Sequence, residues 1–397
     1  MRRFLGLAIV VIVFGLVAAC ASSPAPTVVE VTRLVPGPTA VTPTDPIEVA
    51  IEVTRVVTET VTLVETVSAE RPSPGSAERP FQLLFAPVVE TAVISRRAQV
   101  LADWLTAQTG QQFQVGVLDN EQRVIDLLCA APAETIGFLT AVGVALANQE
   151  CGAQVVNTAV QNNGLSWQAG MIVVRRDSNI TSLDDLDGKS WAIPDAASVP
   201  NNWYFQALLA AQGIEPGEIV TVPGDNTAML AVLNGEVDFA TGTYWPPILP
   251  FEMREWVFGE DDPEIWRQTG AAPSRSGVGF VVVLGRPDQG GYRVRDARSG
   301  VFDTNEAIFD ETRILTLSAA IPADSVAVGG ALPFSLAQQL GPLLTEFAAS
   351  AACADSLCAP DFYGWLGLET AVPASYDPVH FVIDTLGWTD EALLIAD

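Results

Sequence analysis

The sequence predicts an α/β protein with two lobes, each a mainly parallel sheet flanked by helices, and with a ligand cleft between the lobes. Strand and helix patterns alternate over residues 81–139, and a second series of the same kind runs over 171–240. A hydrophobic content of 49% supports folded cores in both series. Ligands of open α/β sheets bind outside the carboxyl ends of the strands, so we expect the cleft where the strand ends of the two series face one another.

Residues 1–19 are predicted to be a signal peptide that precedes this fold. Arg2 and Arg3 come before a short apolar run, 4–17, and two alanines precede Cys20. A basic start, a short apolar core and small residues are typical of a cleavable secretory signal. The position of Cys20 resembles the bacterial lipobox, whose cysteine receives lipid; the alternative is an ordinary signal peptide followed by a cysteine by chance. We therefore expect an extracytoplasmic protein anchored by lipid to the cell membrane of a bacterium.

Residues 20–79 are predicted to be a tether between the lipidated cysteine and the folded body. The segment is rich in Pro, Thr and Val, and a short pattern at 29–33 returns at 51–55. Its alternation of Val with Thr or Glu is also compatible with a β-hairpin, whereas its prolines favour an extended, solvated spacer.

The first lobe is predicted to combine residues 80–175 with the C-terminal residues 326–397. Its strands are short and apolar, its helices carry apolar residues on one face, and Gly110 ends the first helix. The expected strands are 81–87, 113–117, 135–139 and 171–174, and the expected helices are 97–105 and 121–128.

The second lobe is predicted to span residues 176–325, with an insertion at about 246–311. We expect the chain to cross between the lobes near 174–178 and near 322–330. The expected strands are 190–193, 220–222 and 237–240, the expected helices are 182–186, 203–211 and 227–233, and the insertion is expected to hold one more strand at 280–284.

Charge and composition exclude several classes of function. The net charge of −27 repels nucleic acid. The chain has one histidine, His380, and it lacks both the Gly-x-Ser-x-Gly elbow and the lysine-containing phosphate loop. We therefore expect no enzymatic activity, no metal ion and no cofactor.

The five cysteines divide into one candidate for lipidation and four candidates for disulfide bonds. Four cysteines allow three pairings, and disulfides persist outside the cytoplasm. Proximity in the sequence favours the pairs Cys129–Cys151 and Cys353–Cys358.

Several segments resemble the binding proteins of ABC importers. Residues 182–192 resemble their "SLADLKGKRFAF" segment, and residues 231–238 resemble "AVLNGEVD". Residues 104–110, 165–178 and 376–387 resemble segments of the phosphate/phosphite/phosphonate-binding family in particular. The resemblance implies a type II periplasmic-binding-protein fold, a monomer that closes its two lobes on a small solute, and an ABC permease as partner. A lipoprotein that senses a ligand for a membrane receptor would share these features.

The chain departs from that family where the family's anion-binding loop lies. The loop aligns with residues 195–202, in which Ser198 keeps one hydroxyl while Val199 and Pro200 replace a Thr and a second Ser. Asp225 stands at the position of a family histidine. A carboxylate repels an oxyanion and proline offers no N–H group, so we expect a mono-anionic, zwitterionic or neutral solute. A phosphonate bound through backbone N–H groups is the alternative.

The candidate ligand contacts follow strand ends or match family positions. Helix capping is the alternative role for Asn201 and Asp225, because both precede or begin a predicted helix. The candidates are Glu90, Thr91, Thr140, Trp167, Ser198, Asn201, Asn202, Asp225, Asn226, Thr243 and Tyr244.

Overall fold

The computed structural model describes residues 72–252, 254–288 and 290–388. These residues belong to one compact unit that begins at Pro72. The signal peptide, Cys20 and the tether up to residue 71 lie outside the described residues. Within the described ranges, no helix combines the length and the hydrophobicity of a membrane span.

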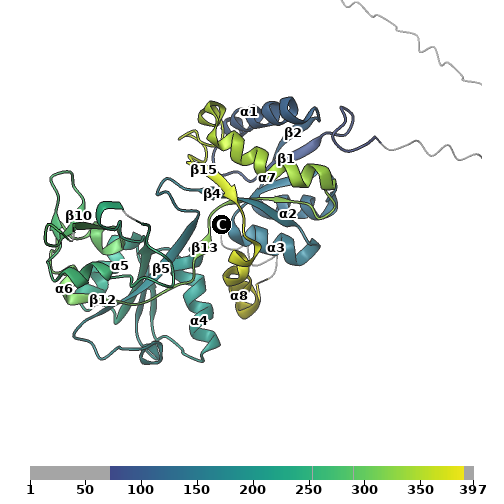
Figure 1. Ribbon diagram of the computed structural model, residues 1–397. Coiled ribbons are helices and arrows are strands. Elements are labelled where there is room, and N and C mark those ends of the chain that lie inside the picture. The colour runs from purple at the N-terminus through teal and green to yellow at the C-terminus, as the bar shows by residue number, and fades with distance from the viewer. Residues whose placement is uncertain (1–71, 253, 289, 389–397) are drawn as a thin grey trace, which may run out of the picture. The chain divides into compact units, whose positions relative to one another are not determined.

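The first sheet has six strands in the order β15-β4-β14-β3-β1-β2. Figure 1 labels four of them, β15, β4, β1 and β2. Strands β1, β2 and β3 pair in parallel, whereas β14 and β15 enter antiparallel to their neighbours. The strands are β1 (Phe81–Phe85), β2 (Phe113–Val117), β3 (Thr135–Leu139), β4 (Gln154–Val160), β14 (Ser325–Val328) and β15 (Gly367–Thr370).

Four of the helices bury apolar residues against this sheet, and the last one, α8, packs mainly on other helices. Asn120 caps α2 by accepting a hydrogen bond from the Arg123 N–H at 3.0 Å, and Thr140 caps α3 in the same way from Gly143 at 3.2 Å. Gly110 ends α1 in the left-handed conformation that glycine adopts without strain. The helices are α1 (Thr91–Thr109), α2 (Glu121–Ala130), α3 (Ala141–Cys151), α7 (Phe334–Ala349) and α8 (Asp377–Leu386).

The second sheet runs in the order β12-β5-β8-β6-β7, and β13 pairs with β5 beside it. Strand β6 is parallel to β7 and β8, and β5 is antiparallel to β8, β12 and β13. The strands are β5 (Trp167–Arg175), β6 (Trp191–Ile193), β7 (Ile219–Thr221), β8 (Phe239–Tyr244), β12 (Thr312–Leu317) and β13 (Ile321–Pro322). The helices are α4 (Tyr204–Ala211), α5 (Gly224–Leu233) and α6 (Ile308–Glu311).

The two-sheet α/β architecture confirms the predicted fold class, but the sheets are mixed. Parallel pairing is confined to β1, β2 and β3 in one sheet and to β6, β7 and β8 in the other. Strands β14 and β15 run against the parallel set of the first sheet, and β5 runs against that of the second. Hydrophobic periodicity identifies such strands but does not give their direction.

The chain passes between the sheets earlier than the sequence suggests. The whole of β5 belongs to the second sheet, so the first crossing lies at 161–166, whereas the predicted boundary follows residue 175. The return passes through 318–324, where β13 still pairs with β5. An apolar strand such as β5 fits the core of either lobe equally well, which is why its pattern did not reveal the boundary.

The folded unit also begins before residue 80, inside the segment predicted as a tether. The Gly75 carbonyl accepts a hydrogen bond from the Gln112 N–H at 2.9 Å, and Gly75 is buried against Phe81. The Arg79 guanidinium bonds the Glu134 carboxylate at 2.5 Å. Residues 72–79 therefore pack on the first sheet instead of extending into solvent.

The predicted insertion contains a third, antiparallel sheet in the order β11-β10-β9. Its central strand is the expected one at 280–284. Fully buried Arg298 bonds the carboxylates of Asp296 at 2.9 Å and Glu264 at 2.8 Å, and this network holds the insertion together. The strands are β9 (Ser274–Arg275), β10 (Val281–Leu284) and β11 (Gly291–Val294). Short helical turns lie at Leu183–Leu186, Val199–Trp203, Pro250–Glu252, Ile265–Thr269, Ala297–Gly300, Ala351–Asp355 and Pro373–Tyr376.

Candidate functional site

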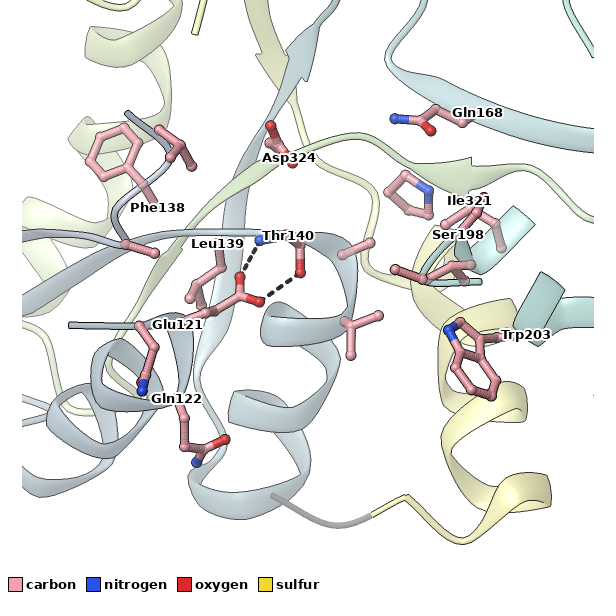
Figure 2. Close-up of a pocket in the computed structure, with 18 of the residues that line it drawn as sticks. Glu121, Gln122, Phe138, Leu139, Thr140, Gln168, Ser198, Trp203, Ile321 and Asp324 are labelled. Atoms are coloured by element: carbon pink, nitrogen blue, oxygen red, sulfur yellow. Dashed lines mark hydrogen bonds between the residues drawn. The ribbon is translucent and has the colours of Figure 1, made fainter. Parts of the chain in front are cut away.

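A cavity of about 600 Å³ is lined by loops from both sheets. On the first side, the lining comes from the carboxyl ends of β1, β2 and β3, as expected for open α/β sheets. On the second side, it comes from the loop after β6 and the helical turn that follows. Figure 2 shows Glu121 and Thr140 on one side and Ser198 and Trp203 on the other. The lining segments are 86–88, 119–122, 138–142, 168, 195, 197–200, 203, 321–322, 324, 363 and 388.

The side chain of Glu121, the first residue of α2, lies at the N-terminus of helix α3. One carboxylate oxygen accepts a hydrogen bond from the Thr140 N–H at 2.5 Å, and the other accepts one from the Thr140 hydroxyl at 2.9 Å (Figure 2). A Cβ at Gly143 would lie 2.6 Å from the Glu121 carboxylate, so only glycine leaves room for it there. The positive end of the α3 dipole is thus already neutralised by a carboxylate of the same chain.

Asp324 lies on the return crossing between β13 and β14, at the back of the cavity. Desolvation of its carboxyl group by the surrounding protein raises its pKa to about 6, although a hydrogen bond with the Trp365 side chain partly offsets this. The hydroxyl of Tyr363, which also lines the cavity, has a raised pKa because of burial and then because of the charges of Asp324 and Glu121. With Asp119, three carboxylates and a phenol therefore share the first side of the cavity.

In the loop at 195–203, on the second side of the cavity, several N–H groups donate hydrogen bonds to oxygen atoms of the same loop. The Asp195 carboxylate accepts a hydrogen bond from the Ala197 N–H at 2.9 Å, and the Ser198 hydroxyl accepts one from the Asn201 N–H at 3.2 Å. The N–H groups of Asn202 and Trp203 donate to the Ser198 carbonyl. This loop offers few N–H groups to a ligand.

Of the predicted contacts, Thr140 and Ser198 line the cavity. Asn201 and Asn202 lie beside it, buried, and they brace the loop. The Asn201 amide donates to the Thr243 hydroxyl at 3.1 Å, and the Asn202 amide donates to the Ala196 carbonyl at 2.6 Å.

The other predicted contacts do not line this cavity. Asp225 accepts a hydrogen bond from the Thr243 N–H at 3.2 Å, and its pKa is raised by desolvation. The buried Tyr244 hydroxyl donates to a backbone carbonyl at 3.3 Å, and Trp167 packs edge-on against Phe258. The exposed members of this group lie at the start of α1 or on α5: Glu90, Thr91 and Asn226.

Several lining residues were missed by the sequence analysis. Asp119, Asn120 and Glu121 directly follow β2, so the strand-end rule that selected Thr140 could have found them. Asp324, Tyr363 and Trp388 come from crossing or C-terminal segments without a motif, and no sequence signal placed them at the cavity.

The cavity is acidic and partly aromatic. Its lining includes four carboxylates, and no Lys, Arg or His belongs to it. The indole rings of Trp203 and Trp388 meet edge to face with their centroids 4.9 Å apart. Within the described residues, no His, Cys, Asp or Glu side chains are grouped as metal ligands. The carboxylates are Asp119, Glu121, Asp195 and Asp324, and the aromatic rings belong to Phe138, Trp203, Tyr363 and Trp388.

The four cysteines of the folded unit lie in the two predicted pairs. The sulfur atoms of Cys129 and Cys151 are 2.03 Å apart, and those of Cys353 and Cys358 are 2.02 Å apart. The first pair joins the end of α2 to the end of α3, the two helices that hold Glu121 and Thr140.

One family model matches most of the chain. The profile of the family described as "ABC transporter, phosphonate, periplasmic substrate-binding protein" matches residues 83–365. A Xanthomonas citri protein bound to ATP is 14% identical with a TM-score of 0.45, covering 77% of this chain and 97% of that chain. A binding component of a Pseudomonas aeruginosa ABC phosphonate transporter is 12% identical with a TM-score of 0.38, covering 77% and 86%. PhnD1 from Prochlorococcus marinus in complex with methylphosphonate is 9% identical with a TM-score of 0.39, covering 77% and 98%. No curated protein matches the sequence significantly.

Proposed function

Because the chain belongs to the periplasmic substrate-binding family of phosphonate ABC transporters, it is a transporter component and not an enzyme, and we propose that it captures a small polar solute in the cavity between its two sheets. The cavity itself carries this proposal. It is lined by strand ends of one sheet and by a loop of the other, so a bound solute contacts both at once.

We propose that capture proceeds by closure of the two lobes. The chain crosses between the sheets at 161–166 and 318–324, and these segments are the natural hinges. A ligand that contacts both sides binds the closed state more tightly than the open one, so it shifts the population toward closure. The closed, loaded form is the one that we expect to dock to the permease.

The chemistry of the second side argues against a dianionic ligand. The loop at 195–203 uses its Ser198 hydroxyl and several N–H groups internally, and Pro200 has no N–H group. A phosphonate would therefore find few charge-assisted donors to offset its desolvation. We propose a solute without a dianionic group.

We further propose that the protein is held at the cell membrane by lipid on Cys20. The lipobox-like sequence before this cysteine supports the anchor. Two acyl chains would suffice for stable attachment, since each buried CH₂ contributes about 0.8 kcal/mol. Mass spectrometry of the mature N-terminus tests this: diacylglyceryl-Cys20 is expected, and an unmodified N-terminus would contradict it.

The importer role is tested with the reconstituted permease and its ATPase in the presence of an extract of the growth medium. Ala197 lines the cavity whereas its neighbour Ala196 does not, although both are exposed. The Ala197→Trp variant fills part of the cavity, and Ala196→Trp is the matched control. We expect wild type and the control to stimulate ATP hydrolysis and Ala197→Trp to lose the stimulation; a folded wild-type protein that gives none would refute the role.

A further inference from the structure

We propose that the solute carries a positive charge and that Asp324 and Glu121 recognise it as an organic cation of the ammonium class. This inference rests on the proposed function, because it names the solute class for the same cavity. It differs from what the family description implies, since a phosphonate is an anion.

The charge of the lining is the first support. Four carboxylates face a cavity of about 600 Å³, and no cationic side chain belongs to its lining. Because Asp324 lies against the low-dielectric interior, its ionised form is poorly solvated while the cavity is empty. A cationic group beside it would supply the missing counter-charge, whereas an anion would add repulsion.

The second support is that the anion-binding positions are taken. In this chain, the N-terminus of α3 is filled by the Glu121 carboxylate, which accepts hydrogen bonds from both donors of Thr140. On the opposite side, the loop N–H groups of Ala197 and Asn201 bond oxygen atoms of the loop itself. An oxyanion would have to displace these intramolecular partners at both places.

The third support is the aromatic part of the lining, which favours an organic cation over a metal ion. Rings of Phe138 and Tyr363 lie on the first side, and Trp203 and Trp388 lie at the other end. The faces of such rings attract alkylated ammonium groups. Metal ions bind these faces poorly because they hold their hydration shells tightly. A cavity of this volume also suits a small organic molecule.

Binding of a cation should release protons near pH 6. The groups around Asp324 are the hydroxyls of Tyr363 and Tyr376, the Trp365 side chain and, across Tyr363, Glu121. No cationic side chain stands among these neighbours. A bound cation therefore lowers the pKa of Asp324 toward its ordinary value, and affinity should fall as the pH drops below about 6.

The test compares cationic, neutral and anionic probes, and one cationic probe is matched in shape by a neutral one. Choline and ethanolamine are the cationic probes, 3,3-dimethylbutan-1-ol is the neutral isostere of choline, and methylphosphonate and inorganic phosphate are the anionic probes. Calorimetric titration and thermal shift at pH 7.5 are expected to show binding of at least one cation. They should also show at least tenfold weaker binding of the isostere and of both anions.

Variants assign the effect to the cavity. Asp324→Asn should weaken binding of the cationic probe at least tenfold, and Glu121→Gln is a second cavity variant that should also weaken it. Asp184→Asn changes an exposed carboxylate outside the cavity and should leave the affinity for the probe unchanged. Binding of phosphate or methylphosphonate without the cations would overturn the inference and leave solute capture intact. Equal affinity for choline and its isostere, an unchanged affinity in both cavity variants, or no binding by any probe would also overturn the inference. The ATPase assay tests the importer role separately.

Discussion

Two carboxylates at the cavity show how position decides what the same chemical group does. Glu121 accepts two hydrogen bonds at a helix N-terminus, so its charge stabilises α3. Asp324 lies on a crossing segment against the protein interior, where desolvation raises its pKa to about 6. One carboxylate is satisfied by the fold, and the other gains most from a ligand.

We predict that Asp324→Asn stabilises the unliganded protein at pH 7.5. The pKa of Asp324 is about 6 in the folded state and near 3.8 when unfolded, so ionisation penalises folding above about pH 6 and does not below about pH 4. Removing the charge should raise the free energy of unfolding by about 1–2 kcal/mol after allowance for water in the cavity. Urea unfolding at pH 7.5 and 4.5 measures this; a gain of equal size at both pH values would contradict the assignment.

We predict the opposite sign for Glu121→Gln. The neutral amide keeps the shape of the side chain but loses the charge at the α3 N-terminus, so the free energy of unfolding should fall by about 1 kcal/mol. Asp119→Asn, at an exposed carboxylate of the same cavity, is the matched control and should change stability little. Thermal unfolding of the three proteins measures the difference, and equal midpoints would argue against the helix-capping role.

At the scale of elements, the turn Val199–Trp203 is positioned by the close approach of strand β5. A Cβ added at Gly170 would lie 2.1 Å from the Pro200 carbonyl oxygen and 2.8 Å from the Asn201 side chain. Only glycine lets the strand pass beneath the turn, which carries Trp203 into the cavity and is capped by Ser198.

We therefore predict that Gly170→Ala displaces this turn. The variant should lose at least 2 kcal/mol of unfolding free energy, because the neighbouring atoms are backbone and must move. Gly277→Ala is the matched control, since no atom lies within 4 Å of its added Cβ and its backbone is not left-handed. Urea unfolding compares the two, and a Gly170→Ala protein as stable as the control would contradict the packing described.

The two disulfides are predicted to contribute unequally. They close loops of 22 and 5 residues, for which chain entropy gives about 3 and about 2 kcal/mol. Replacing Cys129 and Cys151 together by Ser should cost more stability than replacing Cys353 and Cys358. Peptide mapping of the exported protein checks the pairing: four free thiols or a crossed pairing would refute it.

Across the whole molecule, local sequence patterns predicted more of the fold than of the candidate site. Short apolar runs such as Phe81–Phe85 and Thr135–Leu139 were found because burial on both faces leaves a continuous apolar segment. The direction of β14 and the sheet membership of β5 depend on where the chain crosses, which no local pattern encodes.

The candidate site was predicted in part for the same reason. Thr140 directly follows β3, where the strand-end rule expects ligand contacts, and Ser198 was predicted from its match to the anion-binding loop of the family. Asp324 and Tyr363 arrive through the return crossing and the C-terminal segment, from parts of the sequence far from the other lining residues. Asn201 was a plausible contact by sequence, but packing against β5 turns it into a brace for the loop.

The most direct test of a solute cavity between the two sheets is native mass spectrometry of protein incubated with growth-medium extract and then desalted. We expect one small molecule per chain in wild type and in Ala196→Trp, with no such adduct in Ala197→Trp. Tandem fragmentation should identify that molecule as an organic cation. A phosphonate adduct, or an adduct that Ala197→Trp retains in full, would contradict the account.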